Sequence, residues 1–240
     1  MDHNPRSGQT NASAERNIAW FRDNLQGYSI NIHELDTYRA IRSSVNQALS
    51  GIDRLLDIGN GGVFDYDVTL VPTIVALDLF LDKIDTSTYP SHIAFKTGSA
   101  LSIPEPDGSF DGVLMAMLLH HLVGKTVRES LDNIHGAIQE AFRVLKPGGK
   151  LVILESCVPK WFYAFERVVF PLASVILGRF LAHPATLQYP PARISALICE
   201  HSSNVEMVHI PKGRWVLQYG FKVPSVLTPI EVYRFIVQKP

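Results

Sequence analysis

Five short apolar runs constrain the fold more than any other feature of this sequence. They lie at Arg54–Ile58, Ile74–Leu77, Ile93–Phe95, Val113–Met117 and Leu151–Leu154. Several are followed at once by a small or acidic residue. Continuous apolar runs of this length are typical of strands that are buried on both faces, as in a parallel sheet.

Helical patterns lie around and between these runs. From Thr126 to Leu145, apolar residues recur every three or four positions, and Pro147-Gly148-Gly149 stops the pattern. Asp36 can cap a helix that runs to Leu49, with Gly51 just past its end. Strands that alternate with helices predict an α/β doubly wound sheet. Two later runs, Val205–Ile210 and Val232–Val237, predict further strands, the second a candidate antiparallel addition.

Composition narrows the class of protein. Hydrophobic residues make up 46% of the 240 residues, which is enough for a large core. The net charge of −1 gives no electrostatic reason to expect a nucleic acid or an anionic membrane as partner. Neither Cys157 and Cys199 nor the nine histidines show zinc-site spacing, so no metal is expected. The polar N-terminus lacks the apolar stretch of a secretory signal, so a cytoplasmic location is expected.

A glycine cluster directly follows the first predicted strand. Gly59, Gly61 and Gly62 come after the run that contains Asp57. Glycine there lets the backbone turn sharply and approach a ligand without a Cβ in the way. Asp78 ends the next predicted strand, where a carboxylate lies beside the glycine loop and can accept both hydroxyls of a ribose. The glycine cluster and Asp78 together indicate a nucleoside-bearing ligand at the carboxyl ends of the strands. The alternative is that the glycines form only an ordinary tight turn.

Other nucleotide motifs are missing. A dinucleotide GxGxxG motif requires a glycine where Phe64 stands, which disfavours a nicotinamide oxidoreductase. The chain contains no GxxxxGK[ST] motif, so nucleoside triphosphates are unsupported.

Four segments in order resemble the motifs of class I S-adenosylmethionine-dependent methyltransferases. Asp57-Ile-Gly-Asn-Gly61 resembles the first motif, and Asp78 matches the ribose-binding acid. Gly98–Asp111 resembles the family's GDA…LPF.D.SFD segment, and Ala141–Lys150 resembles its helix-turn-strand motif. The likeness covers roughly Arg54 to Glu155 and is strongest to the small-molecule branch, the ubiquinone and menaquinone type.

The resemblance implies a Rossmann-like α/β fold with a seven-stranded, mostly parallel sheet and helices on both faces. It implies S-adenosyl-L-methionine as cofactor, and a set of cofactor-binding residues: Asp57, Gly59, Asn60, Gly61, Asp78, Leu79, Ser99, Ala100, Ala116 and Met117. The chain departs from the family at Ser99, where the family has an adenine-reading Asp, and at Val63, where it has a third glycine. The segment Val63–Pro72 is rich in β-branched residues, so the helix expected there is short.

Two adjacent histidines follow the fourth predicted strand. By the same resemblance, His120 and His121 lie near the sulfonium of the cofactor. A hydroxyl acceptor must lose a proton, and histidine titrates in the right range to remove it. Both are therefore catalytic candidates, His120 ahead of His121. The alternative is that the pair only hydrogen-bonds its own loop.

The segment after the fifth strand is unusually apolar, and the uncharged run Val168–Gly178 is too short to span a bilayer. We interpret it as part of a lid insertion at about 157–200 over a hydrophobic acceptor; the alternatives are core or dimer packing, or a membrane-surface helix. Trp20, Tyr28, Trp161 and Phe162 are candidate acceptor contacts.

These observations divide the chain into a mobile arm at 1–17, a helical cap at 18–51 and a methyltransferase domain at 52–240. They predict a methyltransferase for a small, partly hydrophobic metabolite, with O-methylation in specialised metabolism as the leading expectation. N- or C-methylation, or another reaction on the same cofactor-binding scaffold, are the alternatives. No nucleic-acid or membrane partner is expected, and the protein is expected to be a monomer or a homodimer.

Overall fold

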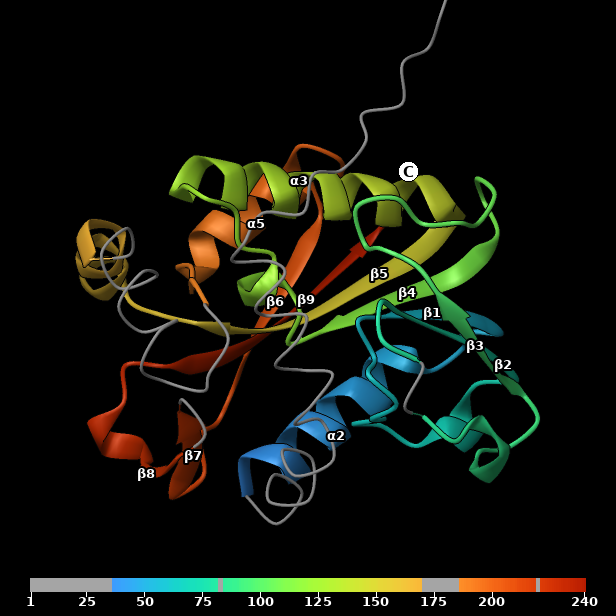
Figure 1. The fold of residues 1–240 in the computed structure, drawn as a ribbon, viewed down its shortest axis with the longest axis horizontal. Coiled ribbons are helices and arrows are strands. Elements are labelled where there is room, and N and C mark those ends of the chain that lie inside the picture. The colour runs from blue at the N-terminus through green and yellow to red at the C-terminus, as the bar shows by residue number, and fades with distance from the viewer. Residues whose placement is uncertain (1–35, 82–83, 170–185, 219–220) are drawn as a thin grey trace, which may run out of the picture.

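A computed structural model describes residues 36–81, 84–169, 186–218 and 221–240. Within them, seven strands form one sheet in the order β3-β2-β1-β4-β5-β9-β6 (Figure 1). Strands β1 (Arg54–Ile58), β2 (Thr73–Asp78), β3 (Ile93–Thr97), β4 (Phe110–Ala116) and β5 (Leu145–Cys157) are parallel. The predicted Rossmann-like α/β class and its five parallel strands are confirmed.

The last two strands of the sheet run in the opposite direction. Strand β9 (Glu231–Gln238) lies antiparallel between β5 and β6 (Val205–Ile210). The antiparallel addition at the C-terminus was therefore predicted correctly. The hairpin of β7 (Trp215–Gln218) and β8 (Phe221–Pro224) lies in the chain between β6 and β9, and the sequence did not predict it.

Helices cover both faces of the sheet (Figure 1). Helix α2 (Asp36–Leu49) buries Ile41, Val45 and Leu49 against one face, in a core shared with Leu55, Leu114 and Val152. Helices α3 (Val127–Val144) and α5 (Pro191–Cys199) cover the other face, where alternate strand residues such as Leu56, Val113 and Ile153 point. Side chains that alternate along each strand thus feed two separate cores, which is why the strands are apolar throughout.

The predicted helical boundaries agree with the structure at two places. Thr126 caps α3 by accepting a hydrogen bond from the backbone N–H of Glu129 at 3.1 Å, and the helix ends at Val144. The first helix of the family is reduced to a short 3₁₀ turn at Val68–Leu70, capped by Asp67, as the β-branched composition predicted.

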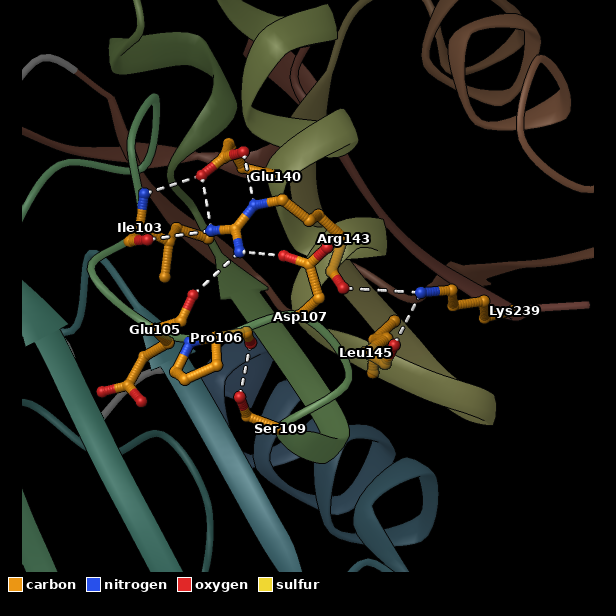
Figure 2. Close-up of polar contacts among 9 residues, drawn as sticks. All are labelled: Ile103, Glu105, Pro106, Asp107, Ser109, Glu140, Arg143, Leu145 and Lys239. Atoms are coloured by element: carbon orange, nitrogen blue, oxygen red, sulfur yellow. Dashed lines mark hydrogen bonds and ion pairs between the residues drawn. The ribbon is translucent and has the colours of Figure 1, made fainter.

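Arg143, near the end of α3, ties the loop before β4 to the helix (Figure 2). Its guanidinium donates to Glu140 at 2.8 and 2.9 Å, to Asp107 at 2.7 Å, and to the carbonyls of Ile103 and Glu105 at 2.9 and 2.8 Å. Lys239 donates to the carbonyl of Leu145 at 2.7 Å beside it. This Arg143 cluster joins the end of α3 to the loop before β4, at the edge of the sheet where the parallel strands begin.

Candidate cofactor and acceptor site

The glycine loop lies where β1 ends. Gly59, Gly61 and Gly62 have φ of +74°, +58° and +79°, a left-handed backbone that glycine adopts without strain. The N–H of Gly59 donates to the carbonyl of Leu77 at 2.8 Å, which anchors the loop to β2. A Cβ on Gly59 would lie 2.7 Å from a methyl carbon of Leu118, so the loop and the segment after β4 are in close contact.

Asp57 holds this loop from inside the protein. Its buried carboxylate accepts hydrogen bonds from the amide of Asn60 at 2.6 Å and from the hydroxyl of Tyr66 at 3.0 Å. Asn60 in turn accepts from the N–H of Gly62 at 2.9 Å and donates to the carbonyl of Val63 at 2.9 Å. Burial raises the pKa of Asp57 to about 7. The structure thus places Asp57 and Asn60 as supports of the loop backbone.

Asp78 ends β2 directly beside the loop. One carboxylate oxygen accepts from the N–H of Gly61 at 2.9 Å, and the other accepts from the N–H of Phe80 at 2.8 Å. Burial raises the pKa of Asp78, against the lowering effect of these backbone donors. A carboxylate has about four lone-pair positions, so each oxygen keeps capacity for a ribose hydroxyl. The next side chain, Leu79, is 47% exposed and offers an apolar surface for a base.

The end of β3 joins the same edge. The N–H of Gly98 donates to the carbonyl of Asp78 at 3.0 Å, which places Ser99 and Ala100 beside it. The hydroxyl of Ser99 accepts from the N–H of Leu101 at 3.1 Å and so closes a local turn. Its proton is still available to donate to a ligand.

The backbone reverses sharply where β4 ends. Met117 has φ of +52°, and its N–H donates to the carbonyl of Leu154 at 2.8 Å. A left-handed methionine is strained, and such strain is found most often at functional sites. The turn after Ala116 carries Leu118 onto Gly59 and begins the short 3₁₀ helix Leu119–His121.

His120 and Glu155 form a buried pair at this turn. The Nδ1 of His120 lies 2.5 Å from the carboxylate of Glu155, whose side chain is 1% exposed. The other oxygen of Glu155 accepts from the N–H of Leu119 at 2.6 Å, and the first also accepts from the N–H of Ser156 at 2.7 Å. The carboxylate is therefore fixed at three points, and it fixes the imidazole in turn. His121 packs on His120 with ring centroids 4.0 Å apart.

Only some of the candidate acceptor residues fall within the described part of the chain. Trp161 and Phe162 lie in the helical residues 160–169, where Trp161 is 68% exposed and its ring contacts Phe162 edge to face. Trp20 and Tyr28 lie outside the described residues, as does the part of the predicted lid at 170–185.

The residues at this edge fit S-adenosylmethionine. A left-handed glycine turn leaves backbone open to a ligand, an acid with spare lone pairs faces it from β2, and an exposed leucine follows. The described residues contain no group of three His, Cys, Asp or Glu side chains placed to hold a metal ion. None of the helices in the described ranges is long and apolar enough to cross a membrane.

Fold and site together define the scaffold of the class I S-adenosylmethionine-dependent methyltransferases. Residues 56–153 match the family model described as a methyltransferase domain. The ubiquinone/menaquinone biosynthesis C-methyltransferase UbiE of Geotalea daltonii is 27% identical over 148 residues, which cover 54% of this chain and 59% of that protein. The chain thus spans less than two thirds of the length of this curated relative.

Solved structures show the same fold. The N-methyltransferase NodS from Bradyrhizobium japonicum, in complex with S-adenosylhomocysteine, has a TM-score of 0.58 at 16% identity, covering 94% of this chain and 98% of NodS. The [4+2]-cyclase SpnF has a TM-score of 0.62 at 16% identity, covering 100% of this chain and 98% of SpnF. One scaffold therefore carries reactions of different kinds, so the reaction must be argued from the site.

Proposed function

We propose that this protein transfers the methyl group of S-adenosylmethionine to a hydroxyl oxygen of a small, partly hydrophobic metabolite. The observation that carries the proposal is the His120–Glu155 pair beside the glycine loop. The turn that begins at Met117 places Leu118 against Gly59 and His120 against Glu155, so the two parts of the site are joined by only a few residues.

Each nitrogen of His120 has a role in the proposed reaction. Its Nδ1 is held by Glu155, which leaves Nε2 as the nitrogen that takes a proton from an acceptor. When bound, S-adenosylmethionine supplies a methyl carbon on a positively charged sulfur. As the acceptor O–H gives its proton to Nε2, the oxygen forms the new bond to carbon and the carbon–sulfur bond breaks. The products are the methyl ether, S-adenosylhomocysteine and a protonated His120, which returns its proton to solvent.

Glu155 acts through His120 and is a positioning residue. A carboxylate on Nδ1 fixes the tautomer and the ring orientation, and it stabilises the imidazolium formed after proton transfer. Replacement by Gln keeps the shape but removes the charge that stabilises the protonated ring. Glu155→Gln is therefore expected to shift the pH profile of kcat and to leave KM for S-adenosylmethionine unchanged.

A second candidate is C-methylation of a hydroxylated ring, favoured by the name of the Geotalea relative. A phenol attacks through a ring carbon more readily once its hydroxyl has lost a proton, so the same base serves both reactions. The two outcomes differ in the product, because a methyl ether has lost the hydroxyl and a C-methylated phenol keeps it. NMR of the product separates them.

The test of the base is His120→Ala with phenolic acceptors, measured as release of S-adenosylhomocysteine. Because a general base contributes about 10²- to 10⁴-fold, kcat is expected to fall by that factor. Affinity for S-adenosylhomocysteine, measured by calorimetry, is expected to stay within about twofold because the contacts of His120 described above, with Glu155 and His121, lie outside the glycine loop.

His135→Ala is the matched control, since His135 is an exposed histidine on α3 that pairs with Glu200 at 3.2 Å. A loss of only about tenfold in His120→Ala with an unchanged pH profile would mean that positioning alone carries the reaction. A large loss in His121→Ala with a mild one in His120→Ala would assign the base to the neighbouring histidine. Wild-type protein that binds S-adenosylhomocysteine but releases none from any acceptor would favour a different reaction on this scaffold.

A further inference from the structure

Glu166 is a half-buried acid outside the site described above. It lies in the helical residues 160–169 that follow β5. Its carboxylate accepts a hydrogen bond from the backbone N–H of Gln188. The second oxygen, Oε2, is buried and has no hydrogen-bond partner among the described residues.

Gln188, from a later segment of the chain, also has a buried oxygen without a hydrogen-bond partner. Its side chain is 6% exposed, and its Oε1 is likewise buried without a partner in the described ranges. Two unmatched hydrogen-bond acceptors therefore belong to residues that are themselves joined, Glu166 to the backbone of Gln188. Buried polar groups in native proteins are nearly always paired, because an unpaired one costs free energy.

The backbone on either side of Gln188 is bonded to the proposed catalytic histidine and to the segment after β5. The N–H of Leu187 donates to the carbonyl of His120 at 3.1 Å, and the N–H of Val158 donates to the carbonyl of Tyr189 at 3.2 Å. Gln188 thus lies between a residue bonded to His120 and a residue bonded to the end of β5. The ring of Tyr163, from the same helical turn as Glu166, packs on Tyr189 with centroids 5.5 Å apart.

From this arrangement we propose that Glu166 and Gln188 form a specificity subsite, which binds a second hydroxyl of the methyl acceptor next to the hydroxyl that is methylated. The proposal rests on the proposed function, since it concerns the same acceptor. Both unmatched atoms are acceptors, so the group they lack is a hydrogen-bond donor. The selected substrate is a vicinal diol, and a phenolic one satisfies both the apolar surroundings and the need for a removable proton.

A neutral donor fits this subsite better than an ammonium group. Burial raises the pKa of Glu166 to about 7, so near neutral pH the carboxyl group is charged for only part of the time. A hydroxyl can donate to either the carboxylate or the amide oxygen, and it is cheaper to bury than a cation. Dopamine, which adds an ammonium to catechol, is therefore expected to bind no more tightly than catechol.

The experiment measures binding of two phenols to the full chain saturated with S-adenosylhomocysteine. Catechol carries the second hydroxyl, and guaiacol carries a methyl ether at the same place. Calorimetry is expected to show wild-type protein binding catechol about tenfold more tightly than guaiacol, the effect of about one hydrogen bond. Glu166→Leu is expected to abolish this preference, and Glu166→Gln to retain most of it because the amide keeps an acceptor oxygen.

Thermal unfolding separates a ligand subsite from a structural contact. Glu166→Leu removes an unmatched acceptor but also the acceptor of the Gln188 N–H, so its Tm is expected to stay close to that of the wild type. Glu200→Leu is the control, because Glu200 is exposed, caps the end of α5 and pairs with His135 of α3; it is expected to keep the preference for catechol. A lower Tm in Glu166→Leu with an intact preference would make Glu166 structural and overturn the proposal.

Equal affinity of wild-type protein for the two phenols, or no binding of either, would also overturn the subsite. Failure of the proposed function gives a different result: catechol would bind with its preference intact, and no S-adenosylhomocysteine would form from S-adenosylmethionine.

Discussion

The two ends of the parallel strands, which form opposite edges of the central sheet, differ in how their charged residues are paired. At the edge where the strands begin, Arg143 pairs with Glu140 and Asp107, and hydrogen bonding from Arg143 lowers the pKa of Glu140 (Figure 2). At the edge where the strands end, Asp57 and Asp78 lie in surroundings that raise the pKa of both carboxyl groups, chiefly through burial. At the first edge, Arg143 and the two acids form ion pairs. At the second edge, hydrogen bonds offset only part of the cost of burying the two acids.

Backbone conformation follows the same division. The strand ends contain a left-handed methionine at position 117 and three left-handed glycines, of which Gly59 lies against Leu118. The strand starts also contain left-handed glycines, Gly51, Gly108 and Gly148, but around each of them a Cβ would meet nothing within 4 Å. The strained methionine and the close backbone contact thus lie at the edge that meets a ligand, together with the buried acids.

Gly59 and Gly148 provide a matched test of this division, since their φ values are +74° and +75°. Gly59→Ala adds a methyl group 2.7 Å from Leu118, whereas Gly148→Ala adds one into open space. Both variants carry the left-handed strain of an L-residue, about 1–2 kcal/mol in unfolding free energy. Only Gly59→Ala is expected to weaken S-adenosylhomocysteine binding, by roughly 100-fold or more.

Calorimetry measures the affinity of both variants for S-adenosylhomocysteine, and urea unfolding measures their stability. If Gly148→Ala weakened binding as much as Gly59→Ala, the loop would have no special role and the comparison between the edges would fail. If Gly59→Ala bound S-adenosylhomocysteine normally, the assignment of the glycine loop to the cofactor would be wrong.

The sheet could be predicted because its strands are short apolar runs that end in glycine or an acid. The hairpin β7–β8 could not, because its strands are four residues long and lie among basic residues and prolines. The division of the chain into arm, cap and methyltransferase domain stays a prediction. Local patterns carry information about buried strands and capped helices, and much less about small exposed hairpins.

Asp57 tests the electrostatic half of the comparison through pH. Its folded-state pKa is about 7, above the ordinary value of 3.8, so the folded protein holds the proton more tightly than the unfolded chain. The stabilisation from this group is present in full below pH 4 and is lost as pH rises toward 7. Asp57→Asn imitates the protonated acid, so it is expected to match the wild type near pH 4 and to exceed it increasingly as the pH rises to 7, by on the order of 3 kcal/mol.

Unfolding in urea at several pH values measures this difference. Asp67→Asn is the control, because Thr69 lowers the pKa of the exposed Asp67 and its titration falls below this range. A constant difference between Asp57→Asn and wild type from pH 5 to 8 would show that Asp57 stays ionised, with its burial fully compensated by Asn60 and Tyr66.

The proposed catalytic pair depends on a contact that the sequence did not predict. His120 was predicted as a candidate base from its place after the fourth strand, and Glu155 was not among the candidates. The two are 35 positions apart, and they meet because β4 pairs with β5 in the register Ala116 to Leu154. The sequence did contain one indication of this contact. Glu155 is a charged residue near the end of an otherwise apolar strand, and a buried carboxylate requires a partner. Glu166 could not be predicted as a site residue, because the unmatched state of its oxygen depends on packing.

Arg143 and Asp78 complete the comparison, with the smallest expected effects. Arg143→Ala removes hydrogen bonds to two carboxylates and two carbonyls, but its side chain is 29% exposed and water replaces part of the loss. We expect a loss of roughly 2–3 kcal/mol in unfolding free energy, with unchanged affinity for S-adenosylhomocysteine. Asp78→Ala is expected to do the reverse, weakening that affinity by roughly 1–3 kcal/mol with little change in Tm. Arg143→Lys is the control for charge: since lysine keeps the charge but lacks the planar fork, it should recover only a minor part of the stability. If Arg143→Ala weakened binding as much as Asp78→Ala, the edges would be coupled through β4 and β5, and stability and ligand binding would not be separable in this sheet.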